Sequence, residues 1–386
     1  MKVVLDTSEV MSDPAFAGVY FKLLREYMVR SGAGLIVPNV AYREALRLMS
    51  DEITAGAKRI LETAQKLERR FPVRLLDRVT ADLIGDLADA DDMLSYTWYG
   101  DVESGFRQRV DEMGVQIGAD PEVSHARLVE AELARRKPFD GSGRGYRDAL
   151  IWCSVIEIAR SEPEVVFVTR NKNDFPKGPG SEPHEDLLQW LRDDGAVSGR
   201  VRIFHSLEEF AKSDIIPDFP RAGDKAALES GRFEKLDLRC AIDERKAEIY
   251  GRFEDVMRRS YPAALAARTF RWWDLDAPRV DVHDLRELAE ERELIVASVT
   301  YSDVVADYGF TVFDAARGSY GERVLVIAPR GVVEAGITDP KYLQLSARLA
   351  IIFQRQTGNV QEFQVTGVRI DSDPSEWANP PPYFEE

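Results

Sequence analysis

Residues 3–10, VVLDTSEV, place three consecutive apolar side chains directly before an aspartate. A short apolar run of this kind predicts a buried β-strand with Asp6 at its carboxyl end. Residues 165–175, VVFVTRNKNDF, repeat the arrangement, because four apolar residues are followed at once by Thr169. Ligands of an open parallel sheet bind beyond the carboxyl ends of its strands. Polar side chains at these two points are therefore candidates for a functional site.

Helical patterns alternate with strands over the first half of the chain. An amphipathic stretch at 16–28 predicts a helix, LIV at 35–37 a second strand, and 40–70 a long charged helix. Residues 146–160 predict a helix that is apolar on nearly every side, and 201–204 predict a weaker strand. This alternation predicts an α/β fold, a three-layer domain with a parallel sheet.

The second half of the chain has a different period. A helical stretch at 226–267 is followed by five segments that are typical of strands: LIVASVTY (294–301), YGFTVF (308–313), RVLVIA (323–328), ARLAIIF (347–353) and VQEFQVTGVRI (360–370). A helix followed by strands predicts a smaller α+β domain with an antiparallel sheet.

These patterns divide the chain into parts. The α/β domain is expected at 1–215, with a helical insertion at about 75–137, where no strand is evident. Residues 216–225 hold two prolines and a glycine without periodicity, which predicts a linker. The α+β domain is expected at 226–370, and the proline-rich tail 371–386 is expected to be flexible.

Composition excludes several classes of protein. Hydrophobic residues make up 44% and charged residues 31% of the 386, which predicts folded cores rather than disorder. No apolar run approaches the roughly 18–20 residues that cross a bilayer, and the first ten residues lack the apolar stretch of a signal peptide. Cys153 and Cys240 lie far apart, which disfavours a disulfide framework. We expect a soluble cytoplasmic protein without membrane contacts.

The net charge disfavours one mode of nucleic-acid binding. The chain has 51 lysines and arginines against 67 aspartates and glutamates, a formal charge of −16. It therefore has no long-range attraction for a polyanion, which argues against duplex DNA held by a broad basic surface. A nucleic-acid enzyme remains compatible with this charge, because a divalent cation held by acidic residues reverses the local field.

Four acidic residues are expected to converge at the carboxyl edge of the sheet. Asp6 ends the first strand, and Glu44 lies early in the helix after the second. Asp148 opens the apolar helix, and Asp174 follows the strand at 165–168. Each alone has an ordinary explanation as a helix cap, a solvated helix residue or a turn residue. Together they would repel one another unless a hard cation such as Mg²⁺ or Mn²⁺ lay among them.

Four stretches resemble the acidic motifs of the PIN-domain ribonucleases, and the likeness is greatest to the larger bacterial branch of that family. They are VVLDTSEV (3–10), VPNVAYREAL (37–46), GYRDALIW (145–152) and VVFVTRNKNDF (165–175). The resemblance covers about residues 1–215 and implies a PIN-like fold. It implies that the catalytic, metal-binding residues are Asp6, Glu44, Asp148 and Asp174, with supporting polar roles for Thr7, Thr169 and Asn171. The gap between Glu44 and Asp148 is longer than in compact toxin-type members.

Basic residues beside the motifs are candidates for phosphate contacts. They are Arg43, Arg144, Arg147, Arg170 and Lys172. Alternatively they pair with neighbouring carboxylates, and the sequence favours neither explanation.

The favoured function is a divalent-metal-dependent endoribonuclease. In this hypothesis a metal-bound water hydrolyses single-stranded RNA and leaves a 5′-phosphate and a 3′-hydroxyl. A single strand is favoured because a narrow acidic cleft suits a flexible strand better than a stiff duplex. Single-stranded or structured DNA stays open as the substrate.

Other classes of function also stay open. A catalytically weak module that binds nucleic acid or protein is disfavoured because all four acids are present. A phosphoaspartyl enzyme usually needs a second aspartate two positions after Asp6, where this chain has Ser8. A homodimer, or a protein partner or antitoxin bound by the C-terminal domain, is compatible with the sequence. Trp272, Trp273 and Tyr301 of that domain could stack on bases, although aromatic residues near strands more often form core.

Overall fold

The structure is a computed structural model that divides into two compact units, Met1–Pro217 and Asp218–Glu386. It describes residues 1–70, 94–139, 144–175, 183–196, 200–222, 230, 232–233, 235–260, 269–274, 278–314, 319–328, 331–334 and 343–370. The backbone alone is described for much of 61–70 and for 94–99, 257–260, 269–274, 302–314, 319–328, 331–334, 343–344 and 370. The two units are considered separately below.

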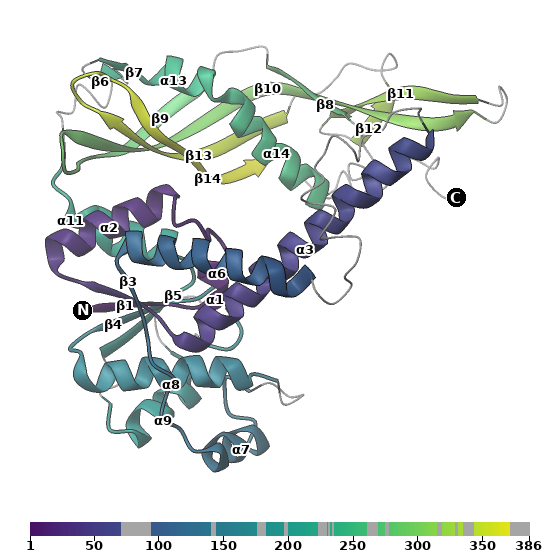
Figure 1. The fold of residues 1–386 in the computed structure, drawn as a ribbon. Helices are drawn as coiled ribbons and strands as arrows, with labels where there is room; N and C mark the ends of the chain where they lie inside the picture. The colour runs from purple at the N-terminus through teal and green to yellow at the C-terminus, as the bar shows by residue number, and fades with distance from the viewer. Residues whose placement is uncertain are drawn as a thin grey trace. The chain divides into compact units, whose positions relative to one another are not determined.

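Unit 1 is built on a five-stranded parallel sheet (Figure 1). The strands are β1 (Lys2–Leu5), β2 (Gly34–Val37), β3 (Val115–Ile117), β4 (Val165–Val168) and β5 (Val201–Phe204), in the order β3-β2-β1-β4-β5. β1 and β4 are central, and Val3–Leu5 and all of β4 are buried. Burial on both faces explains why these two strands are continuous apolar runs. The α/β class with a parallel sheet is confirmed.

Helices cover both faces of this sheet. They are α1 (Thr7–Val10), α2 (Val19–Ser31), α3 (Asn39–Arg70), α6 (Leu94–Met113), α7 (His125–Leu133), α8 (Tyr146–Ser161), α9 (Glu185–Asp193) and α10 (Leu207–Phe210), and a π-helical turn, η2 (Ala211–Ile215), leads into α11 (Ile216–Asp218). Figure 1 shows α2 on one side of the sheet and α8 with α9 on the other. Trp152 of α8 packs against Phe167 and Phe175, with ring centroids 6.1 Å away in both cases. This packing explains the apolar character of α8.

The predicted helical insertion at 75–137 is only partly helical. It contains α6 and α7, but also β3, which pairs in parallel with β2 and forms one edge of the sheet. The prediction missed β3 because the strand has three residues, of which only Val115 is buried. Residues 71–93 lie outside the described part of the chain.

Unit 2 contains an antiparallel sheet, as predicted for a smaller α+β domain. Its strands are β8 (Thr269–Asp274), β9 (Arg279–Glu287), β10 (Arg292–Asp314), β11 (Ser319–Ala328), β12 (Gly331–Glu334), β13 (Leu343–Gln354) and β14 (Val360–Ile370). Two helices, α13 (Leu238–Glu244) and α14 (Lys246–Ser260), contribute Ile242, Ile249 and Phe253 to a core with the sheet. Tyr301 is 1% exposed in this core, which confirms that it is a core residue and not an exposed platform for bases. The side chains of Trp272 and Trp273 lie outside the described part.

Details of unit 2 differ from the sequence prediction. The segments predicted as strands at 294–301 and 308–313 form one strand, β10, which also pairs with β8 and β9. The stretch 226–267 was expected to be helical, but it includes a short hairpin of β6 (Arg232–Phe233) and β7 (Leu236–Asp237). The pairing of these short strands is set by tertiary contacts, which a helical period does not report.

The expected linker at 216–225 is packed as far as it is described. Phe219 and Ala222 are buried, and the Ala222 amide donates to the carbonyl of Leu285 at 3.0 Å. The amide of Glu287 donates to the carbonyl of Pro220 at 2.9 Å, so this segment runs beside β9. Residues 223–229 and the predicted flexible tail 371–386 lie outside the described residues.

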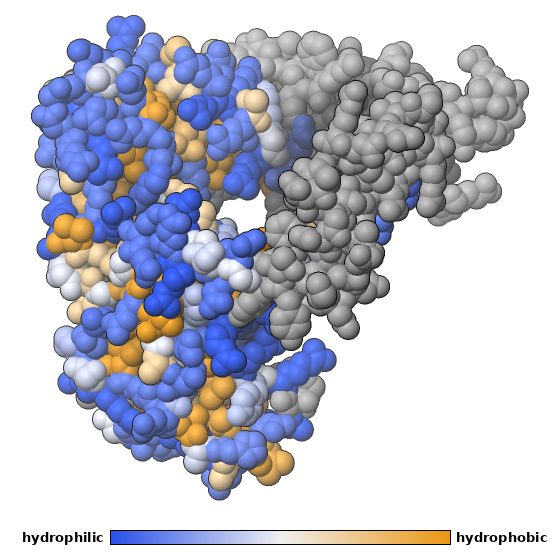
Figure 2. Space-filling view, viewed as in Figure 1, coloured by the Kyte–Doolittle hydropathy of each residue, from blue (hydrophilic) through white to orange (hydrophobic). Residues whose placement is uncertain are grey.

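The surface is predominantly hydrophilic on the face shown in Figure 2. Large exposed apolar side chains such as Val29 and Leu133 are spread over different helices. Isolated exposures of this kind are normal for folded proteins. Among the described residues, no helix combines the length and the apolar character that a membrane span requires.

We predict that Gly145→Ala lowers the free energy of unfolding by about 2 kcal/mol or more. Gly145 precedes α8 with φ of 120°, and a Cβ there would lie 2.4 Å from the Pro138 carbonyl oxygen. The matched control is Gly56→Ala in α3, where a Cβ would meet nothing within 4 Å. This control should raise stability by about 0.5–1 kcal/mol. Equal urea midpoints for the two variants would contradict the prediction.

Candidate functional site

The site begins where the direction of the sheet connections reverses. β1 pairs with β2 on one side and with β4 on the other, and Leu5 lies opposite Val168. The chain leaves β1 toward β2 and leaves β4 toward β5, so the gap beyond β1 and β4 is a topological switch point. Asp6 and Thr169 are the first residues after these two strands. The predicted convergence of these two side chains is confirmed.

Asp6 is held by three donors in a nearly dry position. Its residue is 4% exposed, and its carboxylate accepts hydrogen bonds from the Thr7 amide, the Ser8 hydroxyl and the Thr169 hydroxyl, each at 2.7 Å. The hydrogen bond from the Thr7 amide makes Asp6 the N-cap of α1. Asp6 therefore has a structural role as a helix cap in addition to its place in the site. Burial raises the pKa of Asp6 above its usual range, the three hydrogen bonds oppose the shift, and the charge of Glu44 adds to it.

Glu44 is tied to the end of β1 through Thr7. The Thr7 hydroxyl donates to Glu44 Oε2 at 2.9 Å, which links α1 to α3. The other carboxylate oxygen pairs with the guanidinium of Arg147, from the first turn of α8. The side chain of Glu44 remains 17% exposed, so it lies at the border between the buried acids and solvent.

Asp148 shares the electric field of the other three acids. It lies in the first turn of α8. Burial raises the pKa of Asp148 to about 6, and the negative charges of Asp6, Asp174 and Glu44 add to the rise, in that order. Arg147 opposes it. A carboxyl group affected by three others shows that all four predicted acids occupy one electrostatic neighbourhood.

Asp174 is held by an amide and by an ammonium group. The side chain of Asn171 donates to Asp174 Oδ2 at 2.9 Å, and the Asn171 backbone amide donates to the Thr169 hydroxyl at 3.1 Å. Lys137 Nζ donates to Asp174 Oδ1 at 2.8 Å. Each of the polar residues expected to support the site, Thr7, Thr169 and Asn171, therefore bonds to one of the four acids.

Lys137 is a member of the site that the sequence did not predict. It lies 37 positions before Asp174 in a segment without a recognisable motif, and its backbone amide donates to Asp186 Oδ2 of α9 at 3.0 Å. Only the folded arrangement brings this ammonium group to the acids. No signal in the residues around Lys137 could have indicated it.

The basic residues near the motifs fall into different groups. Arg147 pairs with Glu44, and Arg170 pairs with the buried Glu9 at 2.8 Å. Glu9 also accepts from the Leu207 amide at 3.1 Å, which makes the Arg170 pair part of the framework. The remaining candidates for phosphate contacts, Arg43, Arg144 and Lys172, are exposed.

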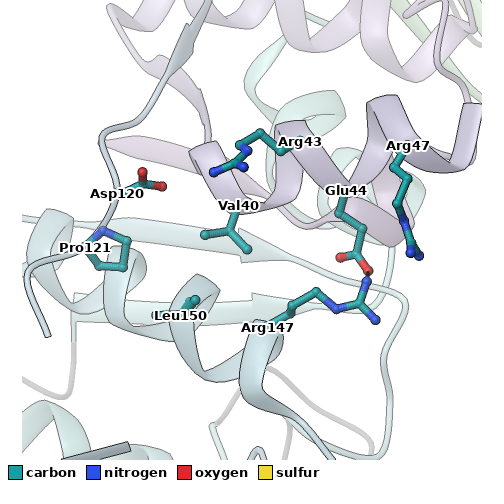
Figure 3. Close-up of a pocket in the computed structure, with 8 residues that line it drawn as sticks. All are labelled: Val40, Arg43, Glu44, Arg47, Asp120, Pro121, Arg147 and Leu150. Carbon is teal, nitrogen blue, oxygen red and sulfur yellow. Dashed lines mark hydrogen bonds and ion pairs between the residues drawn. The ribbon is translucent and has the colours of Figure 1, made fainter. Parts of the chain in front are cut away.

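A groove with a volume of about 680 Å³ lies beside Glu44 (Figure 3). Its lining residues come from α3, α8 and the loop after β3: Val40, Arg43, Glu44, Arg47, Asp120, Pro121, Arg147 and Leu150. Figure 3 shows Glu44 between Arg43 and Arg47 along α3, with its carboxylate directed at Arg147. Arg47 was not among the predicted residues, because it lies just after the motif at 37–46.

The acids are an oxygen-donor set suited to a hard divalent cation. Among the described residues, no three histidine, cysteine, aspartate or glutamate side chains are grouped as a metal-binding cluster. Instead, Asp174 and Glu44 face Lys137 and Arg147. Burial raises the pKa of Asp148, and the charges of Asp6, Asp174 and Glu44 add to the rise while Arg147 opposes it. The chemistry of the site therefore fits a cation, provided that the carboxylates exchange their present partners.

The comparisons agree with this fold and site. A family model described as PIN domain matches residues 3–175, a range that includes all four acids. The match identifies residues 3–175 of unit 1 as a PIN domain, and unit 2 follows this domain as a C-terminal extension. PIN domains are generally nucleases, which indicates a nuclease-type function for unit 1. No curated protein and no solved structure matched the chain.

We predict that Asp148→Asn makes the metal-free protein more stable above pH 6. The folded chain keeps the Asp148 proton up to about pH 6, whereas an unfolded chain loses it near pH 4. The folded state therefore binds more protons in this window, and stability falls as pH rises through it. The asparagine variant lacks this loss, so it should be more stable by about 1–2 kcal/mol at pH 7.5.

The measurement is urea unfolding in EDTA at several pH values between 4.5 and 7.5. The difference in the free energy of unfolding between Asp148→Asn and the unsubstituted protein should shrink toward the acid end of this range. A control, Asp101→Asn on the exposed surface of α6, should follow the unsubstituted protein throughout. A stability difference for Asp148→Asn that stays constant with pH would refute the raised pKa of Asp148.

Proposed function

We propose that unit 1 is a divalent-metal-dependent endoribonuclease that hydrolyses phosphodiester bonds of single-stranded RNA. The observation that carries the proposal is geometric: beyond β1 and β4 the Thr169 hydroxyl donates to Asp6, the Thr7 hydroxyl donates to Glu44 and the Asn171 amide donates to Asp174. Burial, and the charges of these three acids, raise the pKa of the neighbouring Asp148 to about 6. Such a concentration of carboxylates is typical of catalytic sites that use hard metal ions. Membership of the PIN-domain family supports a nuclease.

Asp6, Glu44, Asp148 and Asp174 would hold Mg²⁺ or Mn²⁺, which when bound supplies an activated water and neutralises charge on the phosphate. The remaining residues orient these ligands. Thr169 and Ser8 fix one oxygen of Asp6 at 2.7 Å, while Asn171 fixes one oxygen of Asp174 at 2.9 Å. Hydroxyl and amide donors add no charge, so they orient the carboxylates without competing for the cation electrostatically.

Lys137 and Arg147 have a different role in the proposal. Each is a cation paired with one of the acids, so each must leave its carboxylate when a divalent ion enters. The released ammonium and guanidinium groups would then lie beside the reacting phosphate, where positive charge stabilises the transition state. The pairs thus keep the acids in place before the metal binds.

RNA is proposed as the substrate because the four motifs resemble those of the PIN-domain ribonucleases. A nuclease that acts on single-stranded or structured DNA is the alternative within the same chemistry. A regulatory module without catalysis would not need four neighbouring acids, since repulsion between their charges lowers the stability of the folded protein.

Asp6→Asn and Asp148→Asn are each expected to reduce cleavage of a labelled RNA in Mn²⁺ by about 100-fold or more. Each change removes a charged ligand while leaving the side-chain shape nearly unchanged. The control Asp101→Asn lies on exposed α6 and should cleave normally. A full rate from either site variant would remove the proposed catalytic role, and cleavage of DNA alone would favour the alternative substrate.

Lys137→Met is expected to tighten Mn²⁺ binding by about 3- to 10-fold, because an ammonium group 2.8 Å from Asp174 no longer competes with the ion. In EDTA the same variant should be less stable by about 1 kcal/mol, since Asp174 loses its counter-charge. Calorimetric titration with Mn²⁺ measures the first effect. The exposed Lys66 of α3 provides the control Lys66→Met, which should change neither quantity. Weaker metal binding by Lys137→Met would contradict the competition.

A further inference from the structure

The groove beside Glu44 concentrates positive charge in an acidic protein. The whole chain has a formal charge of −16, yet the lining of this groove has three arginines against two acidic residues, Glu44 and Asp120. Arg43 and Arg47 are one helical turn apart on α3, so their side chains leave the same face of the helix. Arg147 reaches the groove from α8 (Figure 3). A local positive field of this kind attracts an anionic ligand even when the net charge repels it.

Two of these arginines form no ion pair with a carboxylate in the described part of the chain. Arg43 and Arg47 are exposed and have no recorded ion pair or hydrogen bond among the residues described there. The acidic residue on the opposite wall, Asp120, accepts from the side chain of Asn39 at 2.9 Å. The two guanidinium groups are therefore available to a ligand, and a guanidinium can bind a phosphate with two parallel hydrogen bonds.

The rest of the lining is apolar. Val40, Pro121 and Leu150 form it, and they lie among the charged groups in Figure 3. A ligand that pairs with the arginines could place a ribose or base against these side chains. The volume of about 680 Å³ is that of a small-ligand site and suits a short length of polymer. A single strand can bend to follow the walls of such a groove, whereas a duplex is stiff over about 150 base pairs.

We infer that this groove binds the backbone of single-stranded nucleic acid next to the phosphodiester that is cleaved. Arg43 and Arg47 each hold a phosphate, and the apolar residues contact the intervening sugar or base. Arg147 exchanges its pair with Glu44 for a pair with the strand when metal and substrate enter. The inference rests on the proposed function, since Glu44 belongs both to the groove and to the acidic site.

The test is binding of a short fluorescent RNA without secondary structure to the full chain in EDTA, followed by anisotropy. Arg43→Gln and Arg47→Gln should each weaken binding about tenfold or more, because a charge-assisted contact is lost. Each should also reduce the steepness of the dependence of log affinity on log salt by about 0.7. Arg59→Gln is the matched control, because Arg59 is exposed on the same helix about 18 Å beyond Arg47. It should change neither quantity.

Two results would overturn the inference: equal binding by Arg43→Gln, Arg47→Gln and the control, or equal affinity for the RNA and for its duplex. Unfolding midpoints of the variants should match that of the unsubstituted protein, since both positions are exposed. If RNA is cleaved in Mn²⁺ but these variants bind RNA normally, the groove is not the RNA-binding site, while the proposed nuclease activity is supported. Arginine-dependent binding without cleavage in Mg²⁺ or Mn²⁺ would support the groove as a binding site and refute the nuclease.

Discussion

Repulsion among carboxyl groups beyond the ends of β1 and β4 governs how this site is built. Burial raises the pKa of Asp6 and of Asp148, and the negative charges of the neighbouring acids add to both shifts. Neutral hydroxyl and amide groups donate hydrogen bonds to the buried Asp6. The more exposed acids are paired with cations, Glu44 with Arg147 and Asp174 with Lys137. The same field that lowers the stability of the metal-free protein favours a divalent cation.

The fold supplies the framework that makes this repulsion tolerable. The order β3-β2-β1-β4-β5 places the switch point between β1 and β4, whose apolar residues are all buried, so Asp6 and Thr169 follow directly from the core of unit 1. Gly145 allows the chain to turn tightly against Pro138 and to start α8, which carries Asp148 and Arg147. The helix therefore contributes one acid and one cation from a single turn. A site with these opposed charges on rigid elements is preorganised for a charged substrate.

Local patterns predicted most of the framework and the acids, because apolar runs mark buried strands and the residues after them must meet at one sheet edge. Asp6, Thr169 and Asp174 were found in this way. β3 was missed since three edge residues leave almost no pattern, and β10 appeared as two strands. Lys137 and Arg47 were missed for another reason. Lys137 reaches Asp174 only through the packing of its own turn, and Arg47 faces a groove that α3, α8 and the loop after β3 form together, so neither role follows from a motif.

Proton release on metal binding tests the central claim, that the four acids act as one charged unit. Calorimetric titration with Mn²⁺ in buffers of different ionisation enthalpy counts the protons released for each ion bound. Because Asp148 has a pKa of about 6, the account predicts release that approaches one proton at pH 5 and falls toward zero at pH 7.5. Metal binding with no proton release at either pH would show that the ion lies elsewhere, and the absence of binding would contradict the account outright.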